Sequence, residues 1–129
     1  MSALLVLTTV GTEEEASRIA RALVCRRHAA CVNVVPGVKS TYRWQDKVCS
    51  DTEFLLVVKT EESEYAGVEA AIRELHSYEL PEILALSADR GEASFLAWIA
   101  SSVDKTRASG CSEDDELEEP PISLDETNY

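Results

Sequence analysis

The chain has 129 residues, enough for one domain with its own core, and its apolar fraction of 45% and charged fraction of 28% are those of an ordinary globular protein. Its formal net charge is −12 and no part of it is basic, which argues against nucleic acid as a partner. No apolar run approaches the roughly 20 residues that span a bilayer, and the apolar N-terminus lacks a basic leader, so we expect a cytoplasmic protein without membrane segments.

The first elements are a strand and a helix. Residues 3–9 form a nearly continuous apolar run, which predicts a strand covered on at least one face. Thr12 stands three residues before Glu15, the spacing of a capping box, and apolar residues then recur at helical spacing. Arg26 and Arg27 fall in the expected last turn of this helix, where its dipole favours cations.

A long hairpin follows. Residues 29–42 predict a strand bent at Pro36, because proline and glycine inside a strand pattern indicate a bulge or an edge position. Residues 44–47 form the turn and residues 48–59 the returning antiparallel strand.

The second half repeats the strand and helix alternation. Thr60 is expected to cap a second helix, which must stop before Pro81 because proline disfavours helical geometry in the preceding residue. Residues 82–86 form the fourth strand, and the apolar residues within 95–99 belong to a short third helix. The order βαββαβ plus a short helix predicts an α+β, ferredoxin-like domain over residues 1–103 with both long helices on one face of the sheet.

The strands carry apolar residues at both odd and even positions, and therefore on both faces of the sheet. Val32 and Val34 alternate with Cys31 and Val35, although a sheet covered on one side would alternate apolar with polar residues. Too little chain remains to cover the second face, so we predict a homo-oligomer that packs through it.

The composition changes after Val103. Residues 104–129 hold nine acidic residues, two basic residues and little apolar surface, so we predict a disordered tail. It is either a solvated appendage or a charged interaction segment.

Four cysteines are present, and none forms a Cys-x-x-Cys motif: Cys25, Cys31, Cys49 and Cys111. Without an export signal we expect reduced thiols, with Cys31 as a small buried apolar residue.

Polar residues are concentrated at the junction between the second helix and the fourth strand, residues 76–82. His76 is either a metal ligand or a hydrogen-bonding residue at the helix end. Glu82, with Glu79 as a second candidate, would add a carboxylate ligand. We predict a metal site of His76 and Glu82, completed by a neighbouring subunit or by water.

Other polar and aromatic residues suggest a cleft. Lys59, next to the expected helix start, would receive an anion or pair with a carboxylate of the junction. Tyr42, Trp44 and Tyr78 are suited either to an interface or to the lining of a ligand cleft. Asn33, inside an apolar strand, is a candidate for fixing strand pairing between subunits.

Catalysis is not predicted. The sequence has no motif that indicates a nucleophile, and it has no Gly-rich phosphate loop. Acid–base catalysis by His76 with Glu79 or Glu82 is a weaker alternative to a binding role. We therefore expect a protein that is not an enzyme and needs no organic cofactor.

A family resemblance covers residues 4–102. The motifs that carry it stand in order along the chain: Ala29-Ala30-Cys31-Val32-Asn33, Pro36-Gly37-Val38, Ser40, Tyr42-Arg43-Trp44, Lys47, Lys59-Thr60, His76, Tyr78-Glu79, Pro81-Glu82-Ile83 and Leu96-Ala97-Trp98. Together they resemble the CutA family, the divalent cation tolerance proteins.

The resemblance implies a homotrimer with sheets packed inward, similar to the PII signalling proteins, whose sites lie between subunits. It also implies a role in metal homeostasis with Cu(II) or another divalent metal. Thr8 stands where bacterial members have a copper-ligating cysteine, and Leu75-His76 stands where they have a histidine pair. The alternative is a PII-like sensor or scaffold that binds a small molecule or protein partner in the cleft between subunits.

Overall fold

The computed structural model describes residues 2–108, 110 and 111, so most of the predicted disordered tail lies outside the described residues. The elements follow the predicted order: β1 (Ala3–Val10), α1 (Glu13–Cys25), β2 (Cys31–Trp44), β3 (Lys47–Glu61), a 3-10 turn η1 (Glu62–Glu64), α2 (Tyr65–Leu75), β4 (Leu84–Ser87) and α3 (Ala93–Ser102). In the described part of the chain, no helix is long and apolar enough to cross a membrane.

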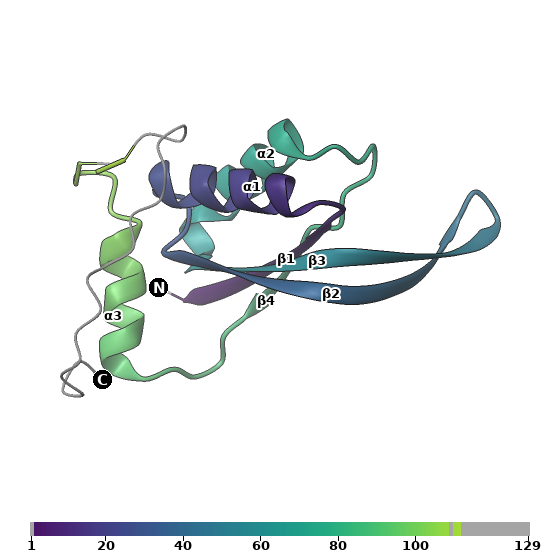
Figure 1. Cartoon of the computed structure of the whole chain (residues 1–129). Helices are drawn as coiled ribbons and strands as arrows, with labels where there is room; N and C mark the ends of the chain where they lie inside the picture. Colours follow the sequence, from purple (N-terminus) through teal and green to yellow (C-terminus); the bar gives the residue numbers. More distant parts are fainter. Residues whose placement is uncertain (1, 109, 112–129) are drawn as a thin grey trace, which may run out of the picture.

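The four strands form one antiparallel sheet in the order β2-β3-β1-β4. Figure 1 shows α1 and α2 side by side over one face, α3 at one end of the sheet, and the β2–β3 hairpin reaching beyond the other end. The core lies between the sheet and the two long helices, where alternate residues of β1 and β3 meet the apolar stripes of α1 and α2.

The first turn of α1 differs from the predicted capping box. Thr12 does cap the helix, since its Oγ1 accepts a hydrogen bond from the Glu15 amide at 3.2 Å. The Glu15 carboxylate, however, points to the junction after α2 and binds Ser77. At the other end, Arg26 is the C-cap and Arg27 lies beyond it, so neither arginine belongs to the last turn.

The hairpin follows the prediction closely. The register shifts between Val35 and Val38, and Gly37 takes a φ of 70°, which gives the predicted bulge at Pro36-Gly37. Gln45 and Asp46 form the two-residue turn with φ values of 49° and 67°, the conformation that matches the twist of paired strands.

The prediction that Thr60 caps the second helix is wrong. Thr60 is fully buried in β3, and its hydroxyl donates to the His28 carbonyl oxygen at 2.6 Å. The strand continues to Glu61 because β1 pairs with it as far as Ala3, and η1 then leads into α2.

The second face of the sheet is apolar, as predicted. Direct register partners share a face, and the residues that alternate with the core residues therefore point away from α1 and α2. They form the open face: Leu5, Leu7, Val35, Leu55, Val57, Leu84 and Leu86. Leu84 and Leu86 are 60% and 50% exposed in the single chain. This surface is what a subunit interface would cover.

The expectation of four reduced thiols is wrong for two of them. Cys25, the last residue of α1, is joined to Cys111 by a disulfide across 86 positions of sequence. Cys31 and Cys49 are free, and Cys31 is half-buried. No spacing motif indicated this pair, whose members are 86 positions apart, and Cys111 lies in the acidic segment that we expected to be unstructured.

Thr8 offers a test of the core. Its side chain is fully buried, and among the described residues its hydroxyl oxygen finds no hydrogen-bond partner. We expect Thr8→Val to raise the free energy of unfolding by about 1 kcal/mol, because valine keeps the shape and removes an unpaired polar group. Chemical denaturation of Thr8→Val and of the matched control Thr9→Val, on the opposite face, checks this; equal midpoints for the two variants would contradict it.

Candidate functional site

The junction after α2 is held by a buried carboxylate. α2 ends at Leu75, and His76 leaves the helix in an extended conformation. The Ser77 amide and hydroxyl then donate to the two carboxylate oxygens of Glu15 at 2.7 and 2.8 Å. Because Glu15 is only 6% exposed and belongs to α1, these bonds fix the junction against the helix layer.

His76 has a positioning role in this arrangement. Its side chain is fully buried, Nε2 donates to the Thr9 carbonyl oxygen at 2.7 Å, and Nδ1 accepts from the Tyr78 amide at 3.1 Å. A carbonyl oxygen can only accept, so the neutral ring carries its proton on Nε2. Both nitrogens are therefore used, and of the two roles weighed for His76 the structure has the backbone hydrogen bonds and not an open metal ligand.

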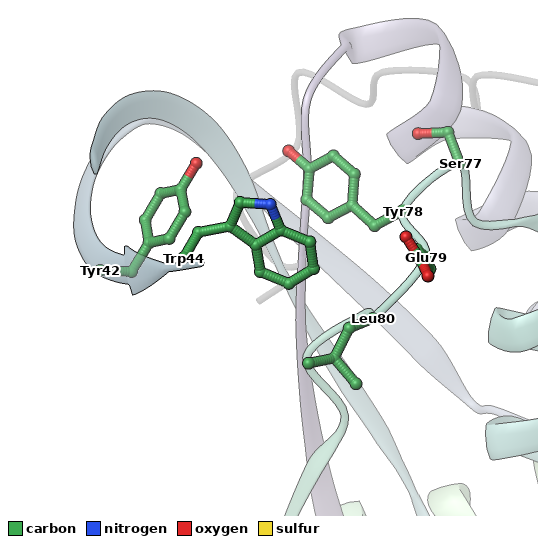
Figure 2. A pocket seen from close by; sticks show the side chains of 6 residues that line it. All are labelled: Tyr42, Trp44, Ser77, Tyr78, Glu79 and Leu80. Carbon is green, nitrogen blue, oxygen red and sulfur yellow. The ribbon is translucent and has the colours of Figure 1, made fainter. Parts of the chain in front are cut away.

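Four of the predicted cleft residues come together around a cavity of about 330 Å³, a size suited to a small ligand. Figure 2 shows Tyr42 and Trp44 projecting from the hairpin toward Tyr78 and Leu80 of the junction. Glu79 and Ser77 complete the lining. Aromatic faces and one carboxylate thus surround a space between two segments far apart in the sequence.

A larger cavity of about 670 Å³ adjoins it and contains two further carboxylates. Glu53 of β3 is only 5% exposed and accepts a hydrogen bond from the Tyr78 hydroxyl at 2.7 Å. Glu82 lines the same cavity, and burial followed by the charge of Glu53 raises the pKa of its carboxyl. A second negative charge is therefore unfavourable in this cavity, whose lining also includes the cationic side chain of Arg43.

Both tyrosines near the cavities stay protonated. The hydrogen bond to Asp51 is the main cause that raises the pKa of Tyr42 to about 12. Burial, and then the hydrogen bond to Glu53, raises the pKa of Tyr78 well above its usual value. These phenols are donors to carboxylates over the physiological range and do not act as bases.

Lys59 and Asn33 lie away from these cavities. The Lys59 ammonium sits 5.8 Å from the centre of the Phe95 ring, which places Lys59 against α3 in a cation–π contact. Asn33 pairs with Val57 on the open face. Neither residue lines the two cavities of the single chain, so their place in a cleft between subunits stays a prediction; β3 carries Lys59 near its end, whereas Glu53, six residues earlier, reaches the cavity.

Two functional residues were missed in the sequence. Glu15 was assigned to a capping box, and Glu53, at the start of an apolar run, was given no role. A carboxylate immediately before Phe54 and four further apolar residues was the available signal for Glu53, since a charge in a strand of that kind needs a partner.

The fit to a metal is partial. Within the described residues, no three His, Cys, Asp or Glu groups are placed to hold one ion. Glu53 and Glu82 offer oxygen ligands, which suit divalent cations, and the remaining ligands would come from water or a second subunit.

Comparison with known proteins gives a consistent result. A family model described as CutA1 divalent ion tolerance protein matches residues 4–102. The "Divalent-cation tolerance protein CutA" of Thermus thermophilus is 48% identical over 94 residues, covering 73% of this chain and 91% of the relative. "Protein CutA 1, chloroplastic" of rice is 37% identical over 99 residues, covering 77% of this chain and 56% of the relative. The crystal structure of CutA from Xylella fastidiosa superposes with a TM-score of 0.79 at 36% identity, over 81% of this chain and 100% of that one.

Proposed function

Because the chain belongs to the CutA1 divalent ion tolerance family, we propose that it acts as a homotrimer that binds a divalent metal ion, Cu(II) or another, in the cavity between Glu53 and Glu82. No catalytic step is part of this proposal. Trimer formation is supported by the open face, whose apolar residues include Leu84 and Leu86.

One observation carries the metal site: Glu53 and Glu82 line one cavity, where burial, and then the charge of Glu53, makes ionisation of Glu82 costly. A divalent cation bound to both carboxylates would offset that cost, because its charge favours their ionised forms. For first-row divalent ions the affinity of such ligands rises toward Cu(II), so a site of oxygen ligands is compatible with copper.

His76 supports this site without being one of its ligands. Its bonds to Thr9 and to the Tyr78 amide hold the start of the junction, and the Tyr78 hydroxyl in turn orients Glu53. In this proposal the ligands are Glu53 and Glu82 in place of the predicted pair His76 and Glu82. His76 positions the junction and does not contact the metal.

Isothermal titration with Cu(II) and Mn(II) tests the site. We expect Glu82→Gln to weaken binding by about tenfold or more, because it removes a charged ligand and keeps the volume. Glu79→Gln is the matched control: it removes a charge from the neighbouring cavity and should leave binding nearly unchanged. Equal affinities for Glu82→Gln and the unmodified protein would remove Glu82 from the site.

The same titration has an expected pH dependence. Only the ionised carboxylate binds the metal, and the pKa of Glu82 is raised. As the pH is lowered, metal affinity should therefore begin to fall at a higher pH than it would for an ordinary carboxylate. In the metal-free protein, stability depends on pH in the opposite direction. The contribution of Glu82 to stability is present below its unfolded pKa and is lost as the pH rises through its raised folded value.

A second candidate function rests on the aromatic cavity of about 330 Å³. Tyr42, Trp44 and Tyr78 would suit an organic ligand or partner segment, as in a PII-like sensor. A thermal-shift screen of metals and metabolites separates the two functions. Stabilisation by a metabolite that is lost in Trp44→Ala would favour the sensor, whereas stabilisation by metals alone supports the metal site.

The cytoplasmic location also stays a proposal. The rice relative is named chloroplastic, so compartments differ among relatives.

A further inference from the structure

The chain continues past the region that the family model covers and returns to the end of α1. The match ends at residue 102, and residues 103–108, 110 and 111 are described beyond it. Figure 1 shows the last described residues next to the C-terminal end of α1, beyond the top of α3. We call residues 104–111 the strap.

Lys105 attaches the strap to the exposed end of a helix. Its ammonium donates to the carbonyl oxygens of Arg26 and Arg27 at 3.0 and 2.6 Å and lies 2.9 Å from a carboxylate oxygen of Glu64. The last carbonyl groups of a helix have no partner within it and favour a cation. The amides of Arg27 and His28 already cap α1, and Lys105 adds a cation at the two carbonyl groups that follow the helix.

Arg27 reaches the strap from the opposite direction. It holds a left-handed backbone conformation with a φ of 57°, unusual for a residue other than glycine. Its guanidinium donates to the carbonyl oxygens of Ser102, at 2.8 Å, and Ala108. The contacts of Lys105 and Arg27 thus cross between the strap and the helix end.

The disulfide closes this arrangement. Cys25 is 6% exposed at the end of α1, whereas Cys111 is exposed. The Lys105 side chain is 48% exposed, and ion pairs in contact with solvent contribute little to stability. The covalent bond is therefore the principal constraint on the strap.

We propose that Cys25–Cys111 is a reducible lock that controls whether the strap is docked on α1. A dithiol reductant is the reaction partner. One of its thiolates attacks the exposed Cys111 sulfur, the Cys25–Cys111 bond breaks, and Cys25 leaves as a thiolate that takes up a proton. The second thiol of the reductant then attacks the mixed disulfide and releases Cys111, which takes up the second proton. Two electrons and two protons pass to the protein, and the dithiol becomes a disulfide.

Reduction changes where the acidic segment is attached. Residues 112–129 contain eight Asp and Glu residues and follow Cys111 directly in sequence. With the lock closed, Cys111 is fixed at the end of α1, whereas with the lock open no covalent bond joins the chain after α3 to that helix. The cavity lined by Glu53 and Glu82 lies at the other end of α1, so this inference stands apart from the proposed function.

Limited trypsin digestion of the full chain tests the lock, because Lys105 and Arg107 are cleavage sites inside the strap. Samples are held with or without a dithiol and digested. Thiols are then blocked, and fragments are separated under reducing conditions so that cleavage itself is counted. We expect dithiol treatment to raise the cleavage rate after Lys105 and Arg107 by about tenfold or more, with cleavage after Lys47 in the hairpin as the internal reference.

Two variants complete the design. Cys111→Ser should be cleaved rapidly with and without the dithiol, and the matched control Cys49→Ser, which removes a free thiol, should behave as the unmodified protein. A non-reducing peptide map of the air-exposed protein should contain one peptide pair joined through Cys25 and Cys111. Four free thiols in that protein, or strap cleavage that does not respond to the dithiol or to Cys111→Ser, would overturn the proposal.

Discussion

Replacing Leu86 with aspartate is expected to convert the proposed trimer into monomers. Leu86 lies on the edge strand β4, opposite Leu5 on the open face, and does not line either cavity. Burying a leucine side chain contributes about 1.5–3 kcal/mol, and an unpaired carboxylate in its place adds a cost of several kcal/mol. Because a closed symmetric assembly repeats every contact, one substitution places this cost in each of three interfaces.

Size-exclusion chromatography with light scattering measures the effect. The unmodified protein should elute with three times the mass of the chain, and Leu86→Asp with the mass of one chain. Val24→Asp is the control, since Val24 is an exposed apolar residue on α1, on the other side of the molecule. A monomeric unmodified protein at micromolar concentration, or a trimeric Leu86→Asp variant, would contradict an interface on the open face.

Replacing Glu15 with alanine is expected to lower the free energy of unfolding by about 3 kcal/mol. The change leaves the Ser77 amide and hydroxyl without their acceptors, and hydrogen bonds to a charged group contribute about 1.5–3 kcal/mol each. Ser77 directly follows His76, whose ring bonds to the Thr9 carbonyl oxygen and the Tyr78 amide, so releasing Ser77 also loosens His76. Metal affinity should fall as well, because the junction no longer positions Glu82.

Chemical denaturation of Glu15→Ala beside Glu14→Ala checks this prediction. Glu14 is an exposed acidic residue in the same helical turn, so the pair separates the loss of the Ser77 contacts from a general effect of removing charge near the helix start. Equal unfolding midpoints for the two variants would show that the Glu15 carboxylate does not hold the junction.

The sequence predicted the elements well because their signals are local. Helical spacing, the bend at Pro36-Gly37 and the stop before Pro81 depend on neighbouring residues, and each was observed. Apolar residues at both odd and even strand positions likewise predicted the open face, because successive residues of a strand point to opposite sides of the sheet.

The site was less predictable because its partners are distant in sequence. Glu15 has the spacing of a capping box, but its carboxylate accepts hydrogen bonds from Ser77, 62 positions away. Lys59 and Asn33 belong to strands that pass near the cavities, yet their register positions place them elsewhere. His76 was correctly located at the junction, but a sequence cannot tell whether ring nitrogens face a cavity or a carbonyl oxygen.

The most direct test of the metal site is a crystal structure of the protein soaked with Cu(II), with the metal located by its anomalous scattering. The expected result is a metal beside the Glu82 carboxylate in the cavity that Glu53 lines, with His76 still donating to the Thr9 carbonyl oxygen. A metal bound to a ring nitrogen of His76, with that hydrogen bond broken, would contradict the assignment. So would a soaked crystal with no metal between Glu53 and Glu82.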